Sequence, residues 1–108
     1  MNAYEVGASD ALKARSVAGD ALDIHHVAQA HPFEQIVCGY SRATGPAIVI
    51  PEAEHALIPT VKGELKMTAR DYLAADIRNL RNLTEAPNYS LQELIVLNKI
   101  MYPGAYTK

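Results

Sequence analysis

The segment PAIVIP, residues 46–51, constrains the fold of this chain more than any other. Its four central residues, 47–50, form a short run rich in β-branched side chains between two prolines, which is typical of a strand. Pro51 then takes the first position of an expected helix over EAEHALI, and two glutamates lie at the positive end of that helix. Pro59 should end or bend the helix. The pattern therefore predicts a strand that passes directly into a short helix.

A further strand is predicted earlier in the chain, over ALDIHHV at residues 21–27. A short helix over ALKARS, capped by Ser9 or Asp10, should precede it. The Gly, Ser and Pro residues of GYSRATGP, residues 39–46, predict a loop between the two strands. Pro32 could start a turn of helix through FEQIV, although a strand fits that segment as well.

Two longer helices are predicted in the C-terminal half. Thr68 should cap the first, whose apolar stripe repeats at i, i+4 and i+7 and consists of Leu73, Ile77 and Leu80. The arginines of RDYLAADIRNLRN alternate with aspartates and are interpreted as a solvated face. The stretch SLQE, residues 90–93, is interpreted as a capping box that opens the second helix. Pro103 and Gly104 should stop that helix after Met101.

These elements predict an α+β fold. A chain of 108 residues supports one hydrophobic core, so we expect a single domain over residues 1–108. A hairpin-and-helix core over about residues 21–60 would precede a helical tail over about residues 68–102. No apolar run approaches the roughly 20 residues of a membrane span, and no signal-peptide pattern is visible. Cys38 has no second cysteine for a disulfide or a thiolate zinc site.

The histidines are the candidate functional residues. His25 and His26 are adjacent on the expected strand, so their side chains should point to opposite faces. His55 lies on the helix that follows the next strand. If that helix packs across the hairpin, His25 and His55 can share one divalent cation through neutral imidazole nitrogens. His26 can then take a proton from a water molecule.

DIHHV followed by AIVIPEAEHALIPT resembles the core of the ββα-metal (HNH) nucleases. A longer stretch, from GDALDIHHVAQAHP through GYSRATGPAIVIPEAEH to ARDYLAADIRNLRNLTEAPNYSLQELIVLNKIMYPGAY, resembles the C-terminal toxin modules of bacterial polymorphic toxins, both Rhs-type and contact-dependent effectors. The resemblance covers roughly residues 18–106.

The resemblance implies that His25 and His55 are metal ligands and that His26 is the general base. It implies an endonuclease that hydrolyses nucleic acid, DNA more than RNA, with a divalent ion, of which Mg²⁺ is favoured and Zn²⁺, Ni²⁺ and Mn²⁺ are alternatives. It also implies a cognate immunity protein, and action in the cytoplasm of a target bacterium after delivery within a larger secreted protein. No membrane anchoring is expected in this chain.

The sequence departs from the family pattern at two places. Pro59 and Thr60 stand where colicin-type nucleases carry a further ligand histidine, and the loop SRATGP lacks the central Asn or His of the family. The ion could therefore be held by two histidines with waters and substrate phosphate, or Asp23 or His31 could supply a third ligand. Arg42 is either a surface arginine or, if its loop faces the metal, a bidentate phosphate clamp.

Two other classes of function remain open. The first is a non-enzymatic immunity or adaptor protein, for which the net charge of −2 would suit masking of a basic toxin. The second is a metal-dependent hydrolase of another substrate, although the sequence contains no HExxH pattern of a peptidase. For the nuclease, we expect the positive potential to be confined to the surroundings of Arg42 and the metal, where an acidic immunity protein would bind.

Overall fold

A three-stranded antiparallel sheet forms the centre of the molecule, in the strand order β1-β3-β2. In this computed structural model, the described residues are 1–27, 33, 37, 39–59 and 68–106. β3 (Pro46–Pro51) is the central strand, and the prolines stand at its two ends, where a missing N–H interrupts least of the ladder. β2 (Leu22–His26) pairs with one edge of β3 and places His25 opposite Ile48. Both predicted strands are confirmed.

The other edge of β3 pairs with β1 (Val6–Ala8), which the sequence pattern did not predict. β1 has three residues, too few for an alternating pattern to be visible in the sequence. It is held in place by the register of Val6 opposite Ile48 and by the backbone bonds that the preceding segment makes to Val49.

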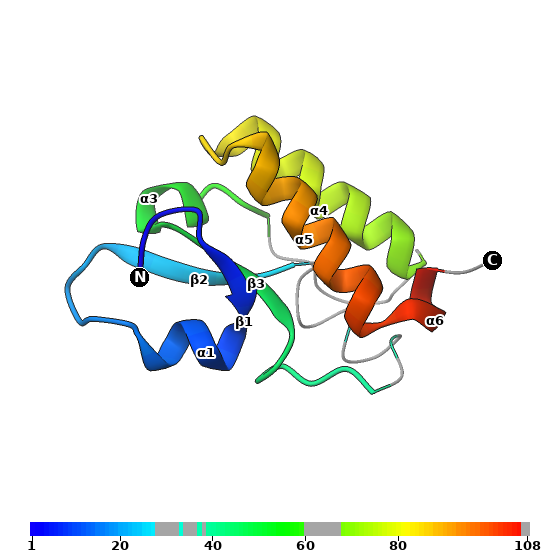
Figure 1. Cartoon of the computed structure of the whole chain (residues 1–108). Coiled ribbons are helices and arrows are strands. Elements are labelled where there is room, and N and C mark those ends of the chain that lie inside the picture. Colours follow the sequence, from blue (N-terminus) through cyan, green and yellow to red (C-terminus); the bar gives the residue numbers. More distant parts are fainter. Residues whose placement is uncertain (28–32, 34–36, 38, 60–67, 107–108) are drawn as a thin grey trace.

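The two faces of the sheet carry different cores. Ile48 and Ile50 of β3 belong to the larger core, which also contains the buried side chains of the C-terminal helices. Ala47 and Val49 belong to a smaller core with Leu12 of α1 (Ser9–Ala14). Figure 1 shows α1 on one side of the sheet and the long helices on the other. Because side chains alternate along a strand, neighbouring residues of β2 also face different layers.

The long helices are α4 (Ala69–Leu83) and α5 (Asn88–Met101), followed by the single turn α6 (Pro103–Tyr106). Thr68 caps α4 as predicted, in a capping box with Asp71. The apolar stripe of α4 is buried as predicted and consists of Leu73, Ile77 and Leu80. The predicted α+β class is therefore confirmed. Among the described residues, no helix combines the length and apolar character needed to cross a membrane.

The predicted capping box SLQE is wrong. α5 begins at Asn88 after Pro87, so Ser90 lies inside the first turn and does not cap the helix. The Ser90 hydroxyl instead donates to the backbone carbonyl of Tyr4 at 2.8 Å. The hydroxyl that would have capped the helix thus bonds to an acceptor far away in the sequence, which no local pattern reveals.

α3 (Glu52–His55) starts directly after Pro51, as predicted, and is one turn long. Two further turn-type bonds, donated by the backbone N–H groups of Leu57 and Ile58, continue the turns as far as Ile58, directly before Pro59. The alternatives for residues 32–37, and the positions of His31 and Cys38, fall largely or wholly outside the described residues.

Candidate functional site

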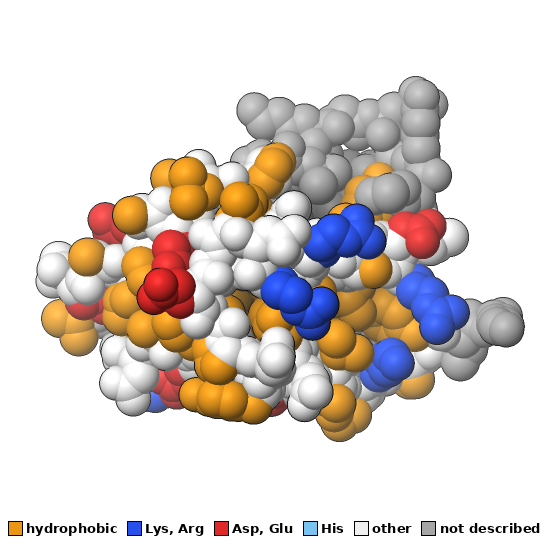
Figure 2. Space-filling view, turned by 90° about the horizontal axis from the view of Figure 1, so that it is seen from above, with side chains coloured by type: hydrophobic (Ala, Val, Ile, Leu, Met, Phe, Trp, Pro, Cys, Tyr) orange, Lys and Arg blue, Asp and Glu red, His pale blue; other side chains and the backbone are white. Residues whose placement is uncertain are grey.

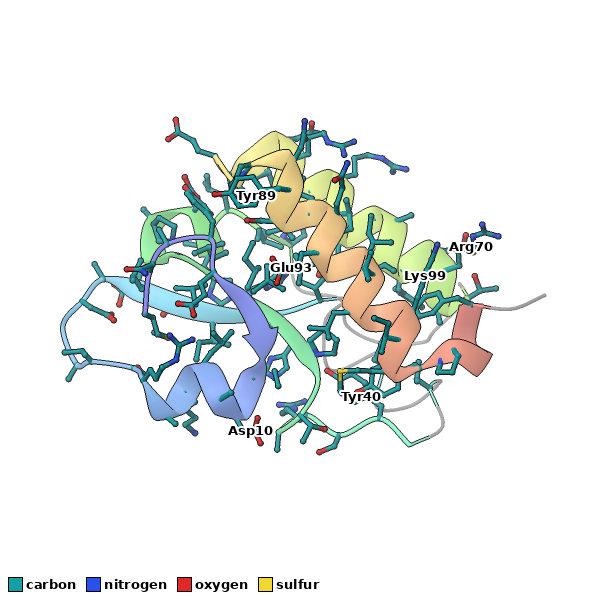
Figure 3. All side chains as sticks on the ribbon, viewed as in Figure 1. Asp10, Tyr40, Arg70, Tyr89, Glu93 and Lys99 are labelled. Carbon is teal, nitrogen blue, oxygen red and sulfur yellow. The ribbon has the colours of Figure 1, made fainter. Side chains whose placement is uncertain are left out.

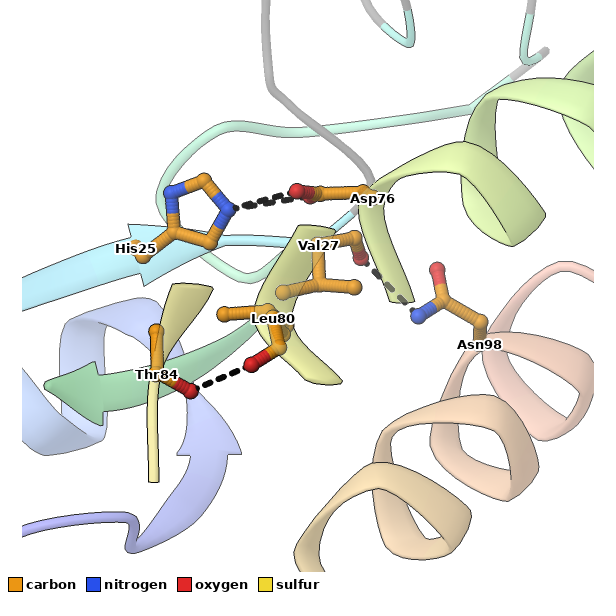
Figure 4. A network of polar contacts seen from close by, with 6 residues as sticks. All are labelled: His25, Val27, Asp76, Leu80, Thr84 and Asn98. Carbon is orange, nitrogen blue, oxygen red and sulfur yellow. Dashed lines mark hydrogen bonds and ion pairs between the residues drawn. The ribbon is translucent and has the colours of Figure 1, made fainter. Parts of the chain in front are cut away.

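A buried histidine–aspartate pair joins the sheet to α4. His25 on β2 and Asp76 on α4 are 5% and 3% exposed, and Nε2 of His25 lies 2.9 and 3.0 Å from the two carboxylate oxygens of Asp76. Figure 4 shows the imidazole and the carboxylate facing one another between the strand and the helix. A buried charge is stable only when it is paired or hydrogen-bonded, so each group depends on the other.

His55 lies beside this pair. The ring centroids of His25 and His55 are 5.2 Å apart, and the ring planes are inclined by 69°. Nδ1 of His55 lies 2.8 Å from a carboxylate oxygen of Asp23, and these two residues are 35% and 40% exposed at the side chain. The structure therefore brings together His25, His55 and Asp23, the residues that the sequence analysis grouped around a metal, and opens the His55 side to solvent.

Asp76 is the member of this cluster that the sequence analysis missed. It was counted among the aspartates of a solvated face, and this interpretation is wrong for Asp76. The signal was present, because Asp76 lies three residues after Leu73 and four before Leu80, both in the buried stripe of α4. A carboxylate in a buried helical stripe requires a polar partner from elsewhere in the fold, and that partner is His25.

The hydrogen bonds define which nitrogen atoms remain as ligands. A neutral imidazole that donates to a carboxylate carries its proton on the donating nitrogen. For His25 this nitrogen is Nε2, and for His55 it is Nδ1. Nδ1 of His25 and Nε2 of His55 are then the atoms with a lone pair available. In metal sites, ligand histidines are oriented by carboxylates in this way.

The separation of the two rings is compatible with one divalent ion bound by both imidazoles. Two imidazoles bound to one ion at about 2.1 Å have ring centres roughly 5 Å apart, which agrees with the observed separation. Among the residues that the structure describes, no group of three or more His, Cys, Asp or Glu side chains is arranged to hold a metal. Asp23 is already the hydrogen-bond partner of His55, so water and substrate oxygens would supply the other ligands.

His26 lies on the opposite face of β2 from His25, as the alternation of a strand requires. It pairs with Ala47, which belongs to the α1 side of the sheet. Nε2 of His26 lies 2.8 Å from the backbone carbonyl oxygen of Arg42. This contact places the proton of a neutral imidazole on Nε2 and makes Nδ1 the basic atom.

The loop before β3 holds that carbonyl group in position. The Gly45 N–H donates to the Ser41 carbonyl at 2.8 Å, which closes the turn around Arg42. A Cβ atom at Gly45 would lie 2.6 Å from the hydroxyl oxygen of Tyr40, so the close approach requires glycine.

His26 and Arg42 line one cavity of about 770 Å³ between β2, α1 and this loop. Asp23 also lines it, as do Asp10 and Lys13. Asp23, whose carboxylate holds His55, is itself a lining residue of the cavity, so the cavity and the His25–His55 pair adjoin at β2. The structure therefore groups His26 with Arg42, and places His25 on the other side of the strand.

Comparisons with protein-family models, with curated proteins and with solved structures each gave no match.

Proposed function

We propose that this chain is a metal-dependent endonuclease that hydrolyses phosphodiester bonds of nucleic acid, with DNA favoured as substrate. One observation carries the proposal. Two histidines from different elements are in ring contact, and each donates a hydrogen bond to its own carboxylate. This arrangement leaves one lone pair on each imidazole, with His55 partly open to solvent, and histidines oriented by carboxylates are typical of metal sites.

In this proposal, Asp76 and Asp23 orient His25 and His55, which hold the ion. When bound, the ion would neutralise the charge that develops on the phosphate oxygens. We favour Mg²⁺, which accepts few protein ligands and retains several waters. His25 is buried, so the more exposed His55 and its partner Asp23 would form the side that meets the substrate.

His26 is proposed to act as the general base. The Arg42 carbonyl fixes the proton on Nε2, so Nδ1 can accept a proton from the attacking water. Arg42 lines the same cavity as His26, and in this proposal its guanidinium would bind a phosphate oxygen pair, with Lys13 adding positive charge. The scissile phosphate would lie at the edge of β2 near Asp23, which lines the cavity and whose carboxylate holds His55.

The biological setting is a proposal that follows from the sequence resemblance. The domain would be the toxic part of a larger secreted protein of the polymorphic-toxin type and would act in the cytoplasm of a target bacterium. A cognate immunity protein would protect the producing cell.

The test is incubation of the purified protein with plasmid DNA and with RNA, each with Mg²⁺ and with excess chelator. We expect metal-dependent cleavage by the parent. In His26→Ala we expect at least about a hundredfold slower cleavage with the same fold, because a general base contributes about 10²–10⁴-fold. Gln92→Ala, at an exposed position on α5, is the matched control.

Three results would contradict parts of the proposal. Cleavage by His26→Ala at the parental rate would contradict the assignment of His26 as the general base. Full activity in excess chelator would contradict the requirement for a metal ion. If neither nucleic acid is cut and expression in bacteria is harmless, a non-enzymatic adaptor or immunity protein becomes the better interpretation.

A further inference from the structure

The groove between α4, α5 and α6 combines an apolar floor with a cationic rim. Its volume is about 380 Å³. The floor is formed by Leu73, Ala74, Ile77 and Ile95, with Tyr106 at one end. Among the described residues that line the groove, every group charged at neutral pH is a cation, and these are Arg70, Arg78, Arg81 and Lys99. Figure 2 shows the Lys and Arg side chains gathered around hydrophobic side chains on this face, and Figure 3 labels Arg70 and Lys99.

The two acidic residues of α4 are hydrogen-bonded to groups outside the groove. The Asp71 carboxylate accepts from the Thr68 backbone N–H in the capping box, and Asp76 points to His25 in the core. Among the described residues, none of the four cations takes part in an ion pair. A chain with a net charge of −2 therefore carries a local positive surface, away from the Arg42 loop where the sequence analysis expected it.

α5 adds exposed apolar surface beside the groove. Val96 and Ile100 are 54% and 70% exposed, and Tyr89 is exposed on the same helical face. Lys99 of the groove precedes Ile100 directly. Glu93 is exposed on this face as well, so the face is amphipathic. A surface helix normally presents polar residues to solvent, so large exposed apolar side chains beside an apolar groove indicate a packing partner.

We propose that this groove, with the adjoining face of α5, binds an acidic amphipathic helix of a partner protein. The apolar side chains of the partner would cover Ile95, Val96 and Ile100, and its carboxylates would pair with the cationic rim. The aliphatic floor favours a protein over nucleic acid, because bases bind on aromatic stacking surfaces. The proposal is independent of the nuclease proposal.

The probe is a fluorescein-labelled peptide of about 18 residues, with Leu at i, i+4, i+7 and i+11 and Glu on its other faces, followed by fluorescence anisotropy. The comparators are the same peptide with Lys for Glu, a scrambled peptide of the same composition, and a single-stranded DNA oligonucleotide. The groove variant is Arg78→Gln with Arg81→Gln. Its matched control is Lys13→Gln with Arg15→Gln, which removes the same charge near α1.

We expect the acidic amphipathic peptide to bind at least roughly tenfold more tightly than the scrambled and the basic peptides. The groove variant and Ile100→Ser should each weaken binding roughly tenfold, and the control should not. All changed positions are at the surface, and thermal unfolding checks that the fold is kept. If the scrambled peptide binds equally tightly, charge alone explains the binding and the proposed role of the apolar groove is wrong. Absence of binding would overturn the proposal, as would binding of the oligonucleotide alone to these residues.

Discussion

At the scale of single residues, the partner of each imidazole decides what that histidine can do. His25 is enclosed between the sheet and α4 and is bound to Asp76, so it contributes to the core as well as to the proposed metal site. His55 has a similar bond to Asp23 but remains partly open to solvent. His26 is oriented by the backbone carbonyl of Arg42, a group that does not titrate. The three histidines, two on β2 and one on α3, therefore have three distinct environments.

Replacing Asp76 should destabilise the fold, and the loss should be smaller when the new side chain can still accept the hydrogen bond from His25. Asp76→Ala leaves the buried Nε2–H of His25 without an acceptor, and we expect the free energy of unfolding to fall by about 3 kcal/mol. Asp76→Asn keeps a carbonyl oxygen and should cost about 1 kcal/mol. Chemical denaturation measures both, with Glu93→Ala at an exposed position as the control. If Asp76→Ala lowers the free energy of unfolding no more than this control does, the buried pair does not stabilise the fold.

His55→Ala is the cleaner test of the proposed metal site, because His55 is partly exposed and not part of the buried pair. We expect the affinity for divalent ions, measured by calorimetry, to fall by at least roughly tenfold. His25→Ala should show the same loss together with lower stability, since it leaves Asp76 unpaired. Unchanged affinity in both variants would eliminate the site.

At the scale of elements, a few long-range contacts fasten the N-terminal segment to the rest of the molecule. The Tyr4 hydroxyl donates to the Glu54 carboxylate of α3 at 2.9 Å, and the Tyr4 carbonyl accepts from Ser90 of α5. Tyr4 holds a backbone φ of 68°, a left-handed conformation that non-glycine residues adopt at a cost. These bonds compensate for that cost and set the start of β1.

The Tyr4–Glu54 contact predicts a pH dependence of stability. Burial, followed by the hydrogen bond to Glu54 and its negative charge, raises the pKa of Tyr4 from 10.0 to about 12. A raised pKa means that the fold favours the neutral phenol, so the stabilisation is complete below pH 10 and is lost as the pH rises through about 12.

Tyr4→Phe should lower the free energy of unfolding by about 1 kcal/mol at neutral pH. The difference between parent and variant should shrink between pH 10 and 12, because the parent loses the contact there. Burial also raises the pKa values of Tyr102 and Tyr106, but parent and variant share these groups, so the difference isolates Tyr4. A constant difference across this pH range would contradict the assignment.

At the scale of the whole molecule, the sheet separates two surfaces of different character. The cavity with His26 and Arg42 lies on the α1 side, and the cationic groove is formed by the helices on the other side. A nucleic acid and a protein partner would therefore meet different layers of the fold.

This separation predicts that the two surfaces act independently. His26→Ala and Arg42→Gln should bind the acidic amphipathic peptide with the affinity of the parent, because neither residue lines the groove. Anisotropy titrations at low and at physiological salt measure this affinity. Weaker peptide binding in Arg42→Gln would instead place the anionic partner over the cavity, as the sequence analysis expected.

The sequence by itself determined the elements whose signals are local. Pro46 and Pro51 delimit β3, Pro51 starts α3, and Thr68 caps α4, because the backbone chemistry of each position acts within one or two turns of the chain. The opposite orientations of His25 and His26, and the shared face of Asp23 and His25, followed from strand alternation alone.

Only the tertiary structure decided which of these faces meet. Asp76 lies 51 positions from His25 in the sequence, and Ser90 lies 86 positions from Tyr4, so no local pattern could reveal either bond. The same holds for β1, which exists through its pairing with β3. It also holds for the cationic groove, because the side chains that line it come from three helices that only the fold brings together. Such features depend on the packing of whole layers, in which residues distant in the sequence replace their contacts with water by contacts with one another.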